Sequence, residues 1–110
     1  MTNALFICGK ARMRSPTAAD LCAAWPGIAT DFAGLSKDAE EQLSLDQIHW
    51  ADIIFVMEKR QAKRLKTLFA RHLRDKRIIV LNVTDIFAYN APALITLLEP
   101  KLRAALHRPI

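Results

Sequence analysis

The 110-residue sequence has no apolar run approaching the roughly 18 residues that a membrane-spanning helix requires. Its opening stretch, MTNALFICGK, lacks the basic start and the long apolar centre of a signal peptide. It also contains no repeat, no low-complexity segment and no linker. The length and the 52% apolar composition fit one packed domain over residues 1–110. We therefore expect a single cytoplasmic domain that has no membrane partner.

Cysteine and histidine are scarce, and their placement argues against disulfides and metal sites. If Cys22 lies two turns into a helix that follows Cys8, a rise of about 1.5 Å per residue places the two about 10 Å apart. A disulfide reaches only about 7 Å between Cα atoms, so we expect a reducing compartment. The three histidines have no metal-ligand spacing. We expect no metal and no cofactor. The histidines expected on the surface are His49, His72 and His107.

The net charge of +5 and the pI of about 9.6 favour anionic partners, and phosphate-bearing ligands in particular. The cations gather in the stretches KRQAKRLK (59–66) and ARHLRDKR (70–77) and in the segment from Lys10 to Arg14. Charge runs such as the first two usually keep a helix face solvated. We therefore interpret both as solvent-exposed faces and do not expect nucleic acid as a partner.

Four short apolar runs predict β-strands. Those at 4–7, 53–57 and 78–83 are apolar without alternation, whereas the run at 28–32 is mixed. Continuous apolar strands are buried on both faces, which is typical of a parallel sheet covered by helices.

Helical signals separate these runs. The first helix takes Ser15 as its N-cap, and a second begins at Ser44, which has capping-box spacing to a glutamine. A third spans 59–73, and the last begins at Pro92 and is kinked or broken at Pro100. The expected buried face of the third helix consists of Ala62, Leu65, Leu68, Phe69 and Leu73, and that of the last helix of Leu94, Leu97, Leu98, Leu102, Ala105 and Leu106.

Strands alternate with helices along the whole chain, which predicts an α/β domain of three layers with right-handed crossovers. Ligands bind such sheets outside the carboxyl ends of the strands. Cys8 lies at one of these ends, in the turn from the first strand to the first helix. The sequence thus predicts a site at Cys8.

The loop CGKARMRSP combines a cysteine, an arginine and a helix start. Backbone N–H groups that wrap around a helix N-terminus converge on one point, where the helix dipole favours an anion. The same field and Arg14 favour the thiolate of Cys8, and Arg14 can donate two hydrogen bonds to a tetrahedral oxyanion. A lone cysteine that ends a buried strand is more often a core residue, as we expect of Cys22, but these spacings favour a nucleophile. The expected phosphate-binding residues are Gly9, Lys10, Ala11, Arg12, Met13, Arg14 and Ser15.

This loop, extended to CGKARMRSPTA, resembles the signature of low-molecular-weight protein tyrosine phosphatases. FAGLS (32–36) and ADIIFVME (51–58) are similar to two later stretches of that family. The segment NVTDIFAYNAPALITLLEPKL (82–102) resembles the tail of a short bacterial branch of tyrosine-phosphatase-like proteins. The resemblance covers most of the chain. It implies a phosphatase I-like three-layer sandwich whose four-stranded parallel sheet has the strand order 2-1-3-4.

The resemblance also implies a phosphomonoester hydrolase that acts on phosphorylated protein or on a small aryl phosphate. Cys8 would attack phosphorus and form a cysteinyl-phosphate intermediate, which water would then hydrolyse. Arg14 would bind the equatorial oxygens, and the Ser15 hydroxyl would stabilise the thiolate as attacker and leaving group. No metal is implied, since arginine and backbone amides supply the electrostatic stabilisation.

The sequence departs from the family pattern at three places. Ala11 stands where the family has an asparagine that holds the loop, and Met13 stands where it has a second cysteine. Ala91 stands where its general acid, an aspartate before proline, would fall. An alternative interpretation is therefore a phosphate-binding module with degenerate catalysis. Arsenate reduction, a third hypothesis, needs a relay of extra cysteines that this sequence hardly provides.

The general acid must then come from elsewhere in the chain. The candidates are Asp85 just past the fourth strand, Glu58 at the end of the third and Asp38 after the second. We favour Asp85, because the short bacterial branch typically carries an aspartate there. Phe87 and Tyr89 could wall a slot for an aromatic substrate, although aromatic residues after a strand are more often core.

Overall fold

Four parallel strands form one sheet, ordered β2-β1-β3-β4, in the computed structural model of the chain. The structure describes residues 1–9, 14–39, 41–84 and 86–106. The α/β class, the parallel sheet and the strand order predicted from the sequence are confirmed. The strands are β1 (Thr2–Cys8), β2 (Ile28–Gly34), β3 (Ile53–Val56) and β4 (Arg77–Val80).

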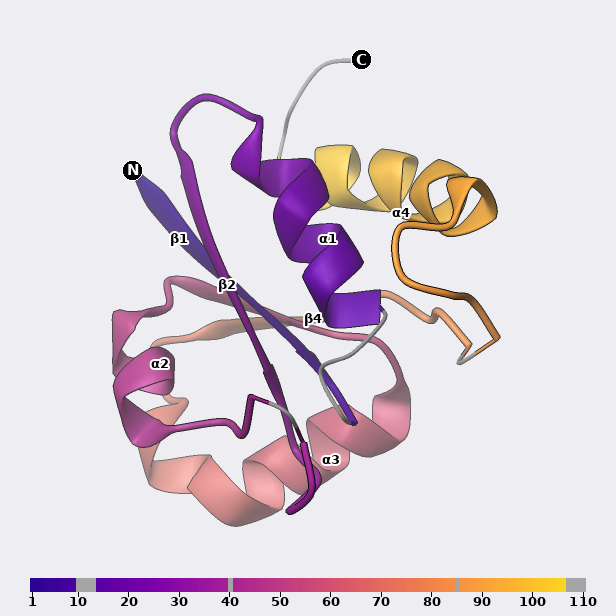
Figure 1. Cartoon of the computed structure of the whole chain (residues 1–110). Helices are drawn as coiled ribbons and strands as arrows, with labels where there is room; N and C mark the ends of the chain where they lie inside the picture. The colour runs from indigo at the N-terminus through magenta and orange to yellow at the C-terminus, as the bar shows by residue number, and fades with distance from the viewer. Residues whose placement is uncertain (10–13, 40, 85, 107–110) are drawn as a thin grey trace.

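Helices cover both faces of the sheet and complete the three layers (Figure 1). One face carries α1 (Arg14–Ala23) and α4 (Pro92–Ala105). The other carries α2 (Leu45–Trp50), α3 (Lys59–Phe69) and the short 3-10 helix η1 (Ala70–His72). No helix in the described part of the chain is long and apolar enough to cross a membrane.

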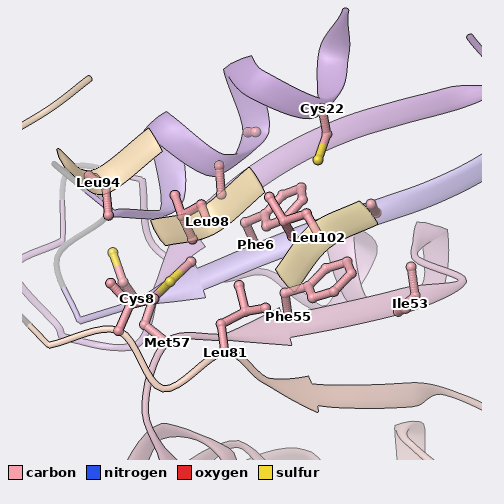
Figure 2. Packing of buried hydrophobic residues seen from close by; sticks show 14 of the residues in the cluster. Phe6, Cys8, Cys22, Ile53, Phe55, Met57, Leu81, Leu94, Leu98 and Leu102 are labelled. Carbon is pink, nitrogen blue, oxygen red and sulfur yellow. The ribbon is translucent and has the colours of Figure 1, made fainter. Parts of the chain in front are cut away.

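The central strand β1 contributes side chains to both apolar cores, which accounts for its apolar run without alternation. Phe6 belongs to the core under α1 and α4, whereas Ile7 belongs to the core under α2 and α3. The ring of Phe6 stacks on that of Phe55 from β3, with centroids 4.9 Å apart (Figure 2). Because β1 lies between β2 and β3, it delivers Cys8 to the middle of the carboxyl edge of the sheet.

The start of α1 differs from the sequence prediction. The helix begins at Arg14, so Ser15 is not its N-cap but a residue of its first turn. The side chain of Ser15 is fully buried and faces the sulfur of Cys8 instead of a backbone amide of the helix. The hydroxyl that was expected to cap the helix therefore contacts Cys8 at the end of β1.

The fourth strand is shorter than the predicted run 78–83. β4 ends at Val80, and Asn82 has a φ of 57°, in the left-handed region that asparagine tolerates better than most residues. Pairing with the neighbouring segment resumes past this point, since the Val83 amide donates to the Met57 carbonyl at 2.8 Å. The chain thus continues along the edge of the sheet after the strand has ended.

The third predicted helix is also shorter than expected, and its apolar face is narrower. α3 ends at Phe69 and continues as η1 instead of running to Leu73. Ala62 and Leu65 are buried as predicted, but Leu68 is 53% exposed. At 3.6 residues per turn, Leu68 lies about 120° around the helix from Ala62, which is too far for both to face one core.

The other two helix predictions hold in most details. Ser44 caps α2 in a capping box: its hydroxyl accepts from the Gln47 amide at 3.2 Å, and Gln47 Oε1 accepts from the Ser44 amide at 3.0 Å. The sequence predicted a kink or a break at Pro100, and α4 is continuous through this residue, so the helix is not broken there. Its fully buried side chains are Leu94, Leu98 and Leu102, and those partly buried against the same core are Leu97, Ala105 and Leu106.

The difference in exposure along α3 predicts the cost of truncating each leucine. Leu65→Ala should lower the free energy of unfolding by about 2–5 kcal/mol, because it removes a fully buried side chain and leaves a cavity. Leu68→Ala, the matched control on the same helix, should lower it by less than about 1 kcal/mol. Urea denaturation followed by circular dichroism measures both values. Equal costs would contradict the placement of Leu68.

Candidate active site

Cys8 and Ser15 meet at the carboxyl end of β1. Their side chains are buried, and the sulfur of Cys8 lies 3.0 Å from the hydroxyl oxygen of Ser15. A hydroxyl at this distance can donate a hydrogen bond to a thiolate and so stabilise its charge. The structure therefore brings together the predicted nucleophile and the residue expected to assist it.

The loop that follows β2 supports the first residues after β1. The Leu35 amide donates to the Cys8 carbonyl at 3.0 Å, and the Ser36 amide donates to the Gly9 carbonyl at 2.9 Å. Apart from Gly9 and its chain neighbours, no atom of the described residues lies within 4 Å of the point where a Cβ on Gly9 would sit. The loop after β2 thus holds the backbone here, and no other described residue crowds Gly9.

Arg14 places a buried positive charge at the same edge of the sheet. Its side chain is only 3% exposed, and its Nη1 donates to the Val83 carbonyl at 2.7 Å and to Glu58 Oε1 at 2.5 Å. Glu58 follows β3 and Val83 follows β4, so both partners come from strand ends far along the chain. These contacts fix the guanidinium at the N-terminus of α1.

Glu58 is held as a carboxylate by two arginines. The hydrogen bond from Arg14 is the main cause that lowers its pKa, and a second from Arg60 Nε, 2.9 Å from Glu58 Oε2, acts in the same direction. A carboxyl group with a lowered pKa is ionised at neutral pH and has no proton to give. Glu58 therefore does not suit the role of general acid that the sequence left open for it.

Of the other two candidates for the general acid, the structure describes only Asp38. Asp38 is exposed in the loop after β2 and accepts a hydrogen bond from the Ser36 hydroxyl. Asp85, the favoured candidate, lies outside the described residues, as do Lys10, Ala11, Arg12 and Met13 of the predicted phosphate-binding loop. Among the predicted site residues, the structure thus assembles Cys8, Gly9, Arg14 and Ser15.

The segment before α4 is tied to α1. The Asn90 amide donates to Thr17 Oγ1 at 2.8 Å, and the Tyr89 hydroxyl donates to Asp20, which raises the pKa of Tyr89. Phe87 is partly buried against the apolar core under α1 and α4. The alternative that Phe87 is a core residue is thereby favoured over an aromatic slot.

Cys22 is a core residue, as predicted. It is fully buried, and burial raises its pKa to about 12. Figure 2 shows it on α1, well away from Cys8, and neither cysteine forms a disulfide. Its thiol therefore stays protonated and remote from the site.

The histidines show one contact that their spacing did not indicate. His49 Nε2 and His72 Nδ1 lie 3.3 Å apart near the surface, and His107 lies outside the described residues. Within the described ranges, no group of three or more His, Cys, Asp or Glu side chains could hold a metal ion.

The Arg14–Glu58 pair is the main feature of the site that sequence reasoning missed. The two residues are 44 positions apart, and the sequence analysis names Glu58 only as a candidate for the general acid. An arginine that becomes buried needs a carboxylate or carbonyl partner, and this need could have prompted a search for one. The need for a partner does not identify which acidic residue of the chain supplies it.

Comparison with known proteins places this geometry in a known fold. No protein-family model and no curated protein matches the sequence. The low-molecular-weight protein tyrosine phosphatase SP-PTP from Streptococcus pyogenes matches 100% of this chain and 94% of its own, with a TM-score of 0.79 and 17% identity. The YwlE arginine phosphatase from Geobacillus stearothermophilus matches 100% of this chain and 99% of its own, with a TM-score of 0.66 and 20% identity.

A third solved structure is a cysteine-to-serine mutant of YwlE arginine phosphatase with a phosphorylated active-site serine. It matches 98% of this chain and 100% of its own, with a TM-score of 0.65 and 14% identity. The chain therefore has the fold of the low-molecular-weight protein tyrosine phosphatases, as its sequence resemblance predicts.

The environment of Glu58 predicts how the stability of the protein depends on pH. Glu58→Gln should lower the free energy of unfolding by about 1–3 kcal/mol at pH 7, because buried Arg14 loses its ionised partner. Since the folded-state pKa of Glu58 lies below 4.5, its stabilisation is present above that pH and is lost as the pH falls through the folded-state value. The difference between wild type and Glu58→Gln should therefore shrink at acidic pH.

Urea denaturation at several pH values measures this difference. Arg60→Ala is the matched control, because Arg60 also pairs with Glu58 but is 75% exposed, so its loss should cost less than about 1 kcal/mol. A cost of Glu58→Gln that stays constant from neutral to strongly acidic pH would rule out the ion pair as its cause.

Proposed function

We propose that this chain is a phosphomonoester hydrolase that works through a cysteinyl-phosphate intermediate. The observation that carries the proposal is the 3.0 Å contact between Cys8 Sγ and Ser15 Oγ at the N-terminus of α1. A helix N-terminus favours an anion, and the guanidinium of Arg14, although paired with Glu58, places N–H donors beside it. This environment suits a thiolate that attacks a phosphate ester.

In the proposed first step, the thiolate of Cys8 attacks phosphorus, so that an S–P bond forms and the bond from phosphorus to the ester oxygen breaks. The leaving oxygen takes a proton from Asp85. In the second step, water attacks phosphorus while Asp85 takes its proton, the S–P bond breaks and inorganic phosphate leaves. The Ser15 hydroxyl stabilises the sulfur anion at both ends of the cycle, and Arg14 binds the equatorial oxygens.

Two further observations support this assignment. The arginine phosphatase with a phosphorylated active-site serine has the fold of this chain. The carbonyl oxygen of Val83, two positions before Asp85 in the sequence, accepts a hydrogen bond from Arg14, so the chain passes the site just before Asp85. The residues that bind phosphate in the proposal are Gly9, Lys10, Ala11, Arg12, Met13, Arg14 and Ser15.

We infer that the substrate is a phosphorylated protein or a small aryl phosphate, with phosphotyrosine as the reacting group. The structural neighbours include tyrosine phosphatases and an arginine phosphatase, which are phosphate-releasing enzymes of two specificities. The net charge of +5 favours such anionic substrates. The proposed place of action is the cytoplasm.

Two alternatives have different support in the molecule. A phosphate-binding module without turnover is favoured by Ala91, which is half-buried against the apolar core and supplies no acid. Arsenate reduction is disfavoured, because Cys22, buried and with a pKa of about 12, is a poor relay thiol.

Hydrolysis of p-nitrophenyl phosphate separates the enzyme from the binding module. Wild type should turn this ester over, and Cys8→Ser should fall to the background rate, because the hydroxyl is a far weaker nucleophile than the thiolate. Cys22→Ala removes the other thiol and is the matched control, which should keep its activity. Equal rates for wild type and Cys8→Ser would remove the enzyme hypothesis.

The role proposed for Asp85 predicts a change in leaving-group dependence. Asp85→Asn should lose on the order of 10²-fold or more in kcat with phenyl phosphate, whose leaving oxygen needs a proton, and much less with a highly activated aryl phosphate. Steady-state rates over a series of aryl phosphates give the slope. If Asp38→Asn steepens the slope and Asp85→Asn does not, Asp38 is the acid. A steep slope already in wild type would favour the binding module.

A further inference from the structure

A groove of about 850 Å³ opens beside Gly9, between the loop after β2 and α3. Its volume falls within the range of sites that hold small ligands or short peptide segments. The Ser36 amide donates to the Gly9 carbonyl at 2.9 Å, so one wall of the groove is bonded directly to the residue that follows Cys8. The described residues that line it are Gly9, Leu35, Ser36 and Lys37, and from α3 Arg60, Gln61, Lys63, Arg64, Thr67 and Leu68.

The groove is strongly cationic. Lys37, Arg60, Lys63 and Arg64 line it, and no carboxylate is among its described lining residues. Arg60 pairs with Glu58, but within the described part of the chain no carboxylate pairs with the other three. Uncompensated like charges repel one another and are stabilised when an anion lies between them.

The charges on α3 form one stripe. Lining positions 60, 63, 64, 67 and 68 follow the three- and four-residue spacing of a single helix face. Half-exposed Leu68 closes the stripe with an apolar surface that water does not stabilise. Gly9, the residue after Cys8, lines the same groove as this helix face.

The nucleophile and the groove are close enough to engage one substrate chain. Cys8 and Gly9 are consecutive, so their Cα atoms lie about 3.8 Å apart, and Gly9 lines the groove. A peptide whose phosphorylated residue is at Cys8 can therefore continue into the groove within a few residues.

We propose that this groove binds an acidic segment of the protein substrate, next to the phosphorylated residue that enters the active site. This proposal rests on the proposed phosphatase function and adds the class of substrate. The partner is a peptide and not a nucleic acid, because no aromatic side chain is among the described lining residues to stack a base. Aspartate and glutamate side chains of the peptide would supply the carboxylate partners that Lys37, Lys63 and Arg64 do not have within the described part of the chain.

Two phosphotyrosine peptides test the proposal. They are identical except that one carries glutamates and the other glutamines on both sides of the phosphotyrosine. Wild type should show kcat/KM about tenfold higher for the acidic peptide at low ionic strength, as expected for two or three exposed ion pairs, and the ratio should fall as salt is added. The ratio compares two peptides on one protein, so it is independent of changes in catalytic competence.

Removing the cations should remove the preference. Lys63→Ala combined with Arg64→Ala should reduce the ratio to about twofold or less. Lys66→Ala combined with Arg74→Ala is the matched control: it removes the same charge, but from residues that line a separate hollow between α3 and β4. The control should keep the wild-type ratio.

Binding to Cys8→Ser, measured by calorimetry with the same peptides, separates this proposal from the proposed hydrolysis. If wild type turns over neither peptide but Cys8→Ser prefers the acidic one, and the preference needs Lys63 and Arg64, hydrolysis fails and the groove proposal holds. Equal affinity for both peptides overturns the groove proposal, as does a preference that survives in the Lys63 and Arg64 variant. Tighter binding of a single-stranded oligonucleotide than of the acidic peptide also overturns it.

Discussion

The site depends on the contacts of the buried Arg14 guanidinium with Glu58 and with the carbonyl of Val83. The charge of the guanidinium is removed from water at the N-terminus of α1, which is costly unless partners inside the protein replace the lost hydration. Glu58 and the carbonyl of Val83 supply this replacement from the ends of two strands. The contacts therefore do more than offset desolvation: they tie the first turn of α1 to the edge of the sheet. Because Ser15 follows in that turn, its hydroxyl is brought to Cys8.

The strand order explains why these groups meet at one place. In a sheet ordered 2-1-3-4, the chain leaves β1 toward β2 and later returns past β1 to β3, so the winding reverses between β1 and β3. Cys8 ends β1 and Glu58 follows β3, on the two sides of this switch point. The stacked rings of Phe6 and Phe55 hold the same two strands together inside the sheet. Core packing and site geometry are thus fixed by the same pair of strands.

The sequence predicted what local patterns determine and missed what tertiary contacts determine. Apolar runs located each strand of the described residues, and the sequence placed Cys8 at the end of the first of them. The end of β4 escaped prediction because Asn82, which tolerates the left-handed backbone, was counted as part of the apolar run 78–83. The exposure of Leu68 escaped because an apolar residue at helical spacing does not reveal how wide the covered arc is. The partner of Arg14 escaped because it lies 44 positions along the chain, where spacing carries no information.

The charges at the carboxyl edge divide into two kinds with different consequences. Arg14 is opposed by an ionised carboxylate, so the pair adds little net charge, and the anion-binding role proposed for Arg14 depends on directed N–H donors at a fixed position. Long-range attraction must then come from cations without an internal partner. Lys63 and Arg64 on α3 have no carboxylate partner among the described residues, and they border the groove beside Gly9. Exposed charges of this kind act over about 10 Å at moderate salt, which is enough to orient an approaching anion before the buried donors can reach it. Under the two proposals, the fold therefore separates attraction of the anion, carried by the surface of α3, from its precise placement, carried by the first turn of α1.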